Sequence, residues 1–244
     1  MLLAVDIGNT NIVLCIHDGE QWGDVIRVKT RSKNAVAEVR SVLEGLSFDR
    51  AVVSSVVPNL TGSVIEAVRS RSGVNPVVIS KDIETGLVKD SIPPELGSDI
   101  ICNLIAAHRL YPGEYVTVAD FGTAFTTATV SPEGEVLGVS IGPGMMTSVK
   151  ALFASAAQIP EIRLDMPSTV LGRDTVASIR AGVFYGFVGQ LKGIVEQIER
   201  EVGHKVVVIA TGGFSVYLEG YIHVNRADVK HTLEGARIAC DLNS

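Results

Sequence analysis

One short motif occurs twice in this sequence, in the same local setting each time. Asp-x-Gly begins at Asp6 and again at Asp120, and an apolar, strand-like run leads into each copy. A second strand-like run and a turn signal follow each copy, with the turns at residues 18–19 and 131–134. Because the repeats of a solenoid are far shorter than this single long spacing, the pattern predicts a duplicated domain.

A break in the pattern separates the two copies. Pro112 and Gly113 interrupt the helical periodicity just before the second copy begins. We therefore predict an N-terminal domain over residues 1–113 and a C-terminal domain over residues 114–244. Two domains of this size are ordinary for a chain of 244 residues.

Hydrophobic periodicity predicts strands and helices in both halves. In the first half we expect strands at 2–5, 11–17, 21–30, 51–57 and 76–80, and helices at 36–46, 59–72 and 98–110. In the second half we expect strands at 115–119, 126–130, 135–141 and 206–210, and helices at 143–157, 174–202 and 233–241. Asn59 is placed to cap its helix and Gly73 to end it. Strands mixed with helices in this way are typical of an α/β protein.

Composition limits the setting in which the protein works. Mean hydropathy is high at +0.32, yet no apolar run approaches the roughly 20 residues that a membrane-spanning helix needs. Asp6 interrupts the first apolar stretch and no basic segment precedes it, so we expect no secretory signal. The three cysteines are far apart, which is typical of reduced thiols in a cytoplasmic protein.

The charge balance and the histidines argue against two further classes of function. A formal net charge of -6 argues against a nucleic-acid surface, which needs clustered Lys and Arg. The five histidines do not cluster with one another or with the cysteines, so we expect no His/Cys metal site.

The repeated motif itself favours phosphate binding. A strand that ends in Asp-x-Gly and turns straight back presents several backbone N–H groups at a tight bend, and glycine lets an oxyanion come close. The neighbouring carboxylate suits Mg²⁺, which prefers oxygen ligands. A late Thr-Gly-Gly at residues 211–213 follows another strand. Because the sequence contains neither GxxxxGK[ST] nor GxGxxG, we predict that paired loops hold a nucleotide across a cleft between the two halves.

Five motifs occur in a specific order: DIGNTN at 6–11, PELGSD at 94–99, DFGTA at 120–124, GPG at 142–144 and TGG at 211–213. Together, and nearly end to end, they resemble the type III pantothenate kinases. The resemblance implies two duplicated ribonuclease-H-like (actin-like ATPase) domains, with mixed five-stranded sheets flanked by helices and a cleft between them. It also implies a cytoplasmic homodimer that phosphorylates pantothenate to 4'-phosphopantothenate in coenzyme A biosynthesis, using Mg²⁺-ATP and a monovalent cation (K⁺ or NH₄⁺).

The resemblance also assigns roles to individual residues. ATP and its phosphates would be bound by Asp6, Gly8, Asn9, Thr10, Asn11, Gly122, Thr123 and Gly212, with Asp6 reaching Mg²⁺ through the phosphates. Asp120 would bind the monovalent cation. The substrate would be bound by Gly97, Ser98, Asp99, Ile100 and Thr175.

Asp99 is the expected general base, because a carboxylate beside the primary hydroxyl can accept its proton during phosphoryl transfer. Without the resemblance, Asp99 is better explained as an ordinary helix N-cap or first-turn acid.

The sequence departs from the family pattern on the acceptor side. Ile100 stands where the family has an arginine, the usual partner of a carboxylate such as that of pantothenate. Asp90 is the nearest match to a tyrosine of the substrate pocket, and Phe125 stands where a threonine is common. Three interpretations stay open: a pantothenate kinase whose pocket compensates, a kinase for another hydroxylated small molecule, or a nucleotide-binding regulator that has lost catalysis.

The long helical segment 174–202 carries four glycines near one side: Gly182, Gly186, Gly189 and Gly193. Each glycine costs a helix roughly 1 kcal/mol relative to alanine, so four of them indicate a close approach of backbone to another element. That element could be the rest of the second half or a second subunit.

Overall fold

The computed structural model describes residues 1–155, 165–218 and 224–244, and the chain divides into two compact units. The first unit contains Met1–Pro112, Glu133–Val136 and Lys230–Ser244, and the second contains Gly113–Pro132 and Leu137–Val229. The division of the sequence into domains at 1–113 and 114–244 stays a prediction.

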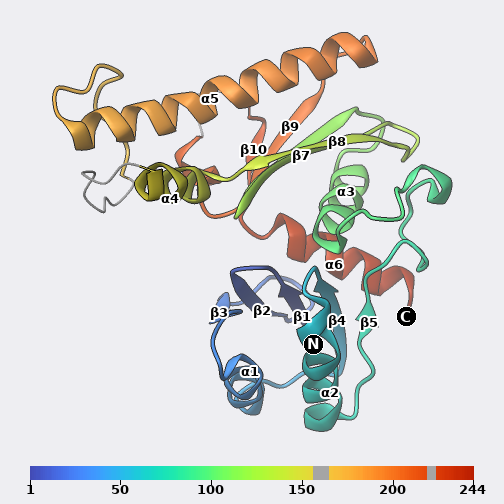
Figure 1. The fold of residues 1–244 in the computed structure, drawn as a ribbon. Coiled ribbons are helices and arrows are strands. Elements are labelled where there is room, and N and C mark those ends of the chain that lie inside the picture. Colours follow the sequence, from blue (N-terminus) through green and yellow to red (C-terminus); the bar gives the residue numbers. More distant parts are fainter. Residues whose placement is uncertain (156–164, 219–223) are drawn as a thin grey trace. The chain divides into compact units, whose positions relative to one another are not determined.

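Each unit contains one five-stranded mixed sheet, and the two sheets have the same strand order (Figure 1). In the first unit the order is β3-β2-β1-β4-β5, with β1 Leu2–Ile7, β2 Asn11–His17, β3 Ile26–Lys29, β4 Arg50–Ser55 and β5 Val77–Val78. In the second it is β8-β7-β6-β9-β10, with β6 Val116–Phe121, β7 Ala124–Val130, β8 Val136–Pro143, β9 Val207–Thr211 and β10 Arg226–Ala227. Strands β1 and β6 each pair antiparallel on one side and parallel on the other. The predicted fold class is therefore confirmed.

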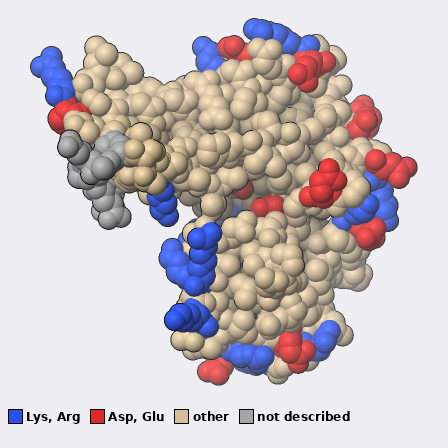
Figure 2. Space-filling model, viewed as in Figure 1, with Lys and Arg blue, Asp and Glu red and all other residues tan. Residues whose placement is uncertain are grey.

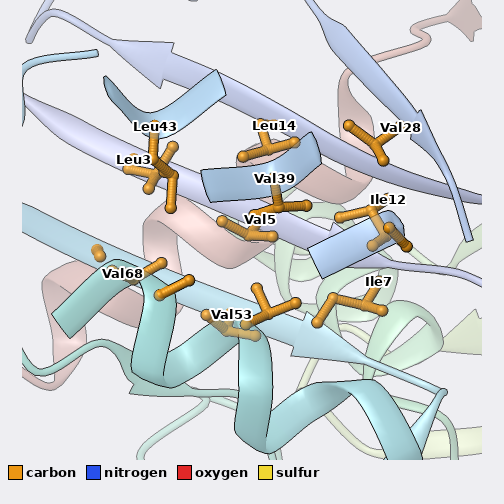
Figure 3. Packing of buried hydrophobic residues seen from close by; sticks show 14 residues of the cluster. Leu3, Val5, Ile7, Ile12, Leu14, Val28, Val39, Leu43, Val53 and Val68 are labelled. Atoms are coloured by element: carbon orange, nitrogen blue, oxygen red, sulfur yellow. The ribbon is translucent and has the colours of Figure 1, made fainter. Parts of the chain in front are cut away.

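Two helices cover one face of the first sheet. Alternate residues of β1, such as Leu3 and Val5, point into an apolar cluster together with residues of α1 (Ala35–Glu44) and α2 (Pro58–Ser72). Figure 3 shows Val39 of α1 beside Val5 of β1 and Leu14 of β2 in this cluster. Full burial of each Val, Leu or Ile side chain contributes roughly 1.5–3 kcal/mol, so this cluster anchors the strand that leads into the first loop.

Helices α3 (Ser98–Leu110) and α6 (His231–Leu242) cover the opposite face of the first sheet. Both contact β4, and neither contributes to the α1–α2 cluster. The two helices approach closely, because a Cβ added to Gly235 would lie 2.9 Å from the Cα atom of Cys102. Thr232 Oγ1 also donates to Asn103 Oδ1 over 2.8 Å. The last helix of the chain therefore fixes α3, whose first turn carries Asp99.

The second sheet packs against a long helix, α5 (Thr175–Val202), and a shorter one, α4 (Met145–Ser155). Phe184, Phe187, Leu191 and Val195 recur at helical spacing on the buried side of α5. They share a cluster with residues of β6 and β9, so α5 supports the strands that border the second loop.

Most predicted elements are present, with local corrections. The helix expected at 98–110 is confirmed as α3. Asn59 does not cap α2, because the helix begins at Pro58, whose fixed φ suits a first helical position, and Val57 is the N-cap. Gly73 does end α2, with φ of 73°. The third strand is shorter than predicted, since Trp22 forms only an isolated bridge with His17 before β3 begins.

The surface carries charges of both signs. On the face drawn in Figure 2, Lys and Arg side chains and Asp and Glu side chains are scattered among uncharged residues, as a composition with 20% charged residues implies. Among the helices of the described ranges, none is long and apolar enough to cross a membrane.

Candidate functional site

The first Asp-x-Gly loop joins β1 to β2 and is held by hydrogen bonds to its own backbone. The N–H group of Gly8 donates to the carbonyl oxygen of Asn11 over 3.0 Å, which closes the hairpin. Thr30 ties the loop down twice: its Oγ1 donates to the Gly8 carbonyl oxygen over 2.7 Å and its N–H to the Thr10 carbonyl oxygen over 3.1 Å. Asn9 and Thr10 are exposed at the tip, where a ligand can reach them.

Two side chains border this loop. Asn11 begins β2, and Lys29 Nζ donates to its Oδ1 over 3.1 Å. Asp6 lies at the end of β1 and is half-buried. Its Oδ1 accepts a hydrogen bond from Ser54 Oγ over 2.9 Å, and Ser54 is the residue directly opposite it in the β1–β4 pair. The first loop is thus bordered by the Asn11 amide, the Lys29 amine and the oriented carboxylate of Asp6.

Asp99 occupies the first turn of α3 and does not cap the helix. The N-cap is Gly97, and Asp99 Oδ1 accepts the N–H of Ile100 over 2.8 Å. A carboxylate that only stabilised the helix N-terminus would have a lowered pKa. Burial instead raises the pKa of Asp99, against the smaller opposing effect of backbone hydrogen bonds. Asp99 is therefore a desolvated carboxylate in the first turn of α3.

The glycine of the Gly97-Ser98-Asp99 segment has a steric reason. A Cβ at Gly97 would lie 2.6 Å from Asp99 Oδ1 and 3.3 Å from Val56 Cγ1. Any larger residue at this position would displace the carboxylate of Asp99. Gly97 therefore shapes the space around Asp99.

Asp6 and Asp99 lie close to the same buried thiol. Burial is the main cause that raises the pKa of Cys102, and the nearby carboxylates of Asp6 and Asp99 raise it further. Ser54 Oγ lies 2.9 Å from Asp6 Oδ1 and 3.0 Å from Ser98 Oγ, so the last residues of β1 and the first turn of α3 meet at one end of the first sheet. This arrangement places a candidate phosphate and Mg²⁺ ligand near a candidate base.

The second Asp-x-Gly loop joins β6 to β7 and is packed by glycines from two other segments. A Cβ at Gly212 would lie 2.6 Å from Asp120 Oδ1 and 2.7 Å from the carbonyl carbon of Phe121. A Cβ at Gly144 would collide with the carbonyl oxygens of Gly122 and Thr123. The motifs at 142–144 and 211–213 thus converge on this loop because only glycine fits there.

Thr123 has a defined backbone environment. Its carbonyl oxygen accepts the N–H of Gly144 over 3.1 Å and the hydroxyl of Thr147 over 2.7 Å. These bonds join the loop to the N-terminal end of α4, so loop and helix form one rigid edge of the second sheet.

The comparisons with known proteins agree with the order of these motifs. A sequence model described as type III pantothenate kinase matches residues 2–197. The chain belongs to the type III pantothenate kinase family. It is 38% identical to a protein named type III pantothenate kinase from Moorella thermoacetica, over 100% of both chains. It is 37% identical to one of the same name from Brevibacillus brevis, over 100% of this chain and 99% of the relative.

A solved structure shares the fold at lower identity. It is a Campylobacter jejuni protein described as a conserved member of the Baf family of transcriptional activators, with a TM-score of 0.62. The two chains are 20% identical, over 98% of this chain and 97% of that one. At this identity the likeness concerns the fold alone.

The positions that depart from the family pattern have distinct environments. Ile100 is buried, with 7% of its surface exposed. Asp90 is exposed in the short 3-10 helix Lys89–Ser91. Phe125 is a core residue, with its ring 4.8 Å from that of Phe121 and 5.8 Å from that of Phe187. Phe125 therefore packs beneath the second loop as a core residue, whereas Ile100 is buried directly beside Asp99, whose Oδ1 accepts its N–H.

Thr175 is exposed at the start of α5, after the N-cap Asp174, whose Oδ1 accepts the N–H of Ala177 over 2.8 Å. It belongs to the second compact unit, whereas Gly97, Ser98, Asp99 and Ile100 belong to the first.

The chemistry of the donors fits Mg²⁺ that arrives with ATP. Within the described ranges, no group of three or more His, Cys, Asp or Glu side chains could hold a metal ion. Mg²⁺ usually keeps several waters and is bound through one or two carboxylates plus substrate phosphates. Asp6, a single oriented carboxylate beside an exposed loop, fits that mode.

Sequence reasoning missed Ser54 and Thr30, which hold the first loop and its carboxylate. A signal for Ser54 was present, since it interrupts an otherwise apolar strand run at 51–57. Thr30 carried no comparable signal, because its partner Gly8 is distant in the sequence and meets it only through sheet pairing.

Proposed function

We propose that this protein transfers the γ-phosphoryl group of ATP to pantothenate, giving 4'-phosphopantothenate in coenzyme A biosynthesis. Full-length similarity to proteins named type III pantothenate kinase is the observation that carries the proposal. The hydrogen bonds that link Asp6 through Ser54 to Ser98, the neighbour of Asp99, support it from the structure.

The two loops hold the nucleotide. Gly8, Asn9, Thr10 and Asn11 of the first loop bind the ATP phosphates; the Gly8 N–H closes the hairpin, so Gly8 contributes close approach of the backbone. Gly122, Thr123 and Gly212 are likewise assigned to the nucleotide. Asp6 would hold Mg²⁺ that arrives with ATP, and the ion would neutralise charge on the phosphate oxygens. The exposure of Asn9 and Thr10 supports this assignment.

Asp99 serves as the general base. The primary hydroxyl of pantothenate attacks the γ-phosphorus, the bond to the leaving ADP oxygen breaks, and Asp99 accepts the hydroxyl proton. Because burial raises the pKa of Asp99, its ionised form is a stronger proton acceptor than an exposed aspartate. Gly97, Ser98, Ile100 and Thr175 border the acceptor in this proposal.

Asp120 binds the monovalent cation, K⁺ or NH₄⁺. Its carboxylate lies against the Gly212 backbone at the end of β6, and carboxylate and carbonyl oxygens suit hard cations. A cation there would neutralise a half-buried carboxylate beside the second loop.

The protein works as a cytoplasmic homodimer in this proposal. Gly182, Gly186, Gly189 and Gly193 of α5 are exposed, and a Cβ at any of them would meet nothing within 4 Å. Gly189 and Gly193 also line a groove of about 640 Å³ between α5 and strands β7 and β8. Four helical glycines that face open space favour a second copy over packing within the unit.

A direct assay tests the function. The protein is incubated with Mg²⁺-ATP, K⁺ and pantothenate, and 4'-phosphopantothenate is measured against an Asp99→Asn control. Product formation above the control is expected, and its absence would sink the kinase proposal. A thermal shift by ATP without any product would instead favour the nucleotide-binding regulator, because a ligand of the native state raises apparent stability.

Recognition of the substrate carboxylate is tested at Ile100. The wild type is compared with Ile100→Arg on pantothenate and on panthenol, in which a hydroxyl replaces the carboxylate. Since Ile100 offers only apolar contact, we expect the wild type to discriminate weakly between the two acceptors. Arg at this position should raise the preference for pantothenate by about tenfold, the worth of one charge-assisted hydrogen bond. A strong preference in the wild type would show that another residue binds the carboxylate.

A further inference from the structure

Ser54 lies at the centre of a hydrogen-bonded cluster in the first unit. Its side chain is fully buried, at 0% exposure. Its Oγ is 2.9 Å from Asp6 Oδ1 and 3.0 Å from Ser98 Oγ. It also hydrogen-bonds the thiol of Cys102. One hydroxyl thus contacts the end of β1 and two positions of α3.

The direction of these bonds follows from the chemistry of the partners. An ionised carboxylate only accepts hydrogen bonds, so Ser54 must give its single hydroxyl proton to Asp6. Ser98 must then be the donor in its bond with Ser54. The oxygen of Ser98 in turn accepts the N–H of Ser55 over 2.7 Å. The result is one directed chain from the β4 backbone through Ser98 and Ser54 to Asp6.

This chain connects the two functional carboxylates of the proposed function. Ser98 is the first residue of α3 and Asp99 the second, so the hydrogen bonds that hold the Ser98 hydroxyl fix the start of the helix next to Asp99. Asp6 lies at the other end of the chain, next to the first loop. Ser54 therefore joins the group expected to orient Mg²⁺-ATP to the helical turn expected to carry the base.

Packing alone does not explain a serine here. Val53 precedes the pair Ser54–Ser55 and Val56 follows it, and Val52 and Val53 of β4 are fully buried. A buried hydroxyl is unfavourable unless it is hydrogen-bonded, whereas a small apolar residue would fill the position without that requirement. The hydroxyl lies directly opposite the Asp6 carboxylate in the β1–β4 pair and donates to it.

We propose that Ser54 is a positioning residue: it orients Asp6 towards Mg²⁺-ATP and keeps the start of α3, with Asp99, in register with it. This inference rests on the proposed function of Asp6 and Asp99. It assigns to Ser54 an effect on metal–nucleotide binding and on turnover.

The test is the Ser54→Ala variant of the full chain. We expect kcat to fall roughly 10–100-fold, as is typical when the partner of a metal-binding carboxylate is removed. The Mg²⁺ concentration for half-maximal activity should rise by a similar factor. Ser54→Thr, which keeps the hydroxyl, should restore most of the kcat.

A matched control separates positioning from stability. Thr117 in β6 is also fully buried, and its Oγ1 pairs with Thr129 Oγ1 over 3.0 Å, away from the carboxylates. Thr117→Val should change the melting temperature about as much as Ser54→Ala while leaving the Mg²⁺ dependence unchanged. If Ser54→Ala keeps the wild-type Mg²⁺ dependence, or if Thr117→Val alters it equally, Ser54 has only a structural role and the inference fails.

A binding measurement keeps the inference testable apart from the reaction. The thermal shift produced by ATP is titrated with Mg²⁺ in the wild type, Ser54→Ala and Ser54→Thr. If the wild type forms no product but shows the shift, the proposed function fails, and a weaker Mg²⁺ dependence in Ser54→Ala alone still supports the role of Ser54. If ATP raises the melting temperature of neither the wild type nor any variant, both proposals are overturned.

Discussion

The two Asp-x-Gly loops follow the same strand order in their sheets, yet different groups hold them in place. Side-chain hydroxyls hold the first: Thr30 bonds the Gly8 carbonyl oxygen and Ser54 bonds Asp6. The second loop also accepts hydrogen bonds, from the Gly144 N–H and the Thr147 hydroxyl to the Thr123 carbonyl oxygen, but Gly144 and Gly212 are packed against it with no room for a side chain. Hydrogen bonds thus hold both loops, and steric fit of glycine against backbone is added at the second.

This difference has consequences for substitution. A side-chain hydrogen bond can be weakened gradually, and its loss mainly affects the orientation of the group that it holds. Its net contribution to the free energy of unfolding is about 1 kcal/mol. A glycine that is packed against backbone does not tolerate even alanine, because the first added carbon already overlaps the neighbouring atoms. We therefore expect substitutions at the first loop to change activity more than stability, and those at the second to change stability first.

The largest effect is expected for Asp99, which has no counterpart among the groups that hold the second loop. Asp99→Asn keeps the shape and an oxygen that can accept the Ile100 N–H, but it cannot accept the proton of the substrate. Loss of a general base lowers kcat roughly 10²–10⁴-fold. Steady-state assays with saturating ATP measure this change. A variant with more than a tenth of the wild-type kcat would remove Asp99 from the reaction.

The same substitution should not destabilise the protein at neutral pH. Because burial raises the pKa of Asp99, the folded protein retains a proton in a pH window where the unfolded chain has lost it. The contribution of Asp99 to stability is thus fully present below its unfolded pKa and is lost as the pH rises through the folded pKa. Asp99→Asn should melt at or above the wild-type temperature at about pH 8, and this advantage should shrink towards about pH 4. A lower melting temperature at both pH values would indicate that Asp99 is a structural acid.

Gly212→Ala should be the most damaging substitution at the second loop. Gly212 has φ of 85°, and its Cβ would overlap Asp120 and the backbone of Phe121. Strain and overpacking should lower the free energy of unfolding by about 3 kcal/mol. The neighbour Gly213 provides a matched control, because a Cβ there would meet nothing within 4 Å. Gly213→Ala should stay within about 0.5 kcal/mol of the wild type in urea unfolding. Equal losses in both variants would contradict the steric account.

Thr30→Val tests the hydroxyl that holds the first loop. The substitution removes the bond to the Gly8 carbonyl oxygen and keeps the side-chain volume. Unfolding free energy should fall by only about 1 kcal/mol, while the KM for ATP rises because the loop is less ordered. Calorimetry and ATP titrations measure the two quantities. A loss as large as that of Gly212→Ala would show that both loops depend on fit in the same way.

The sequence predicted what depends on local pattern and missed what depends on sheet pairing. The periodicity of residues 98–110 was sufficient for α3, and the two loops were evident from their strands and glycines. Ser54 escaped notice because its partner Asp6 is opposite it only once β1 and β4 pair. Gly144 and Gly212 were recognised as motifs, but their contact with the second loop requires the β6–β9 pair and the start of α4. Contacts between residues that are distant in the sequence could not be predicted from the pattern of a single strand.

The smallest effects are expected at exposed glycines within helices. One such glycine from each unit can be compared. Gly62 in α2 and Gly189 in α5 are both exposed, and a Cβ at either would meet nothing within 4 Å. In a single copy, alanine at either position should stabilise the helix by up to about 1 kcal/mol. Gly62→Ala should keep this gain at every protein concentration. If a second copy covers α5, Gly189→Ala should lose its gain as the concentration rises, and its dimer should dissociate more readily in analytical ultracentrifugation. Identical behaviour of the two variants would exclude the glycine face of α5 as the contact between subunits, because only a covered glycine is sensitive to the partner.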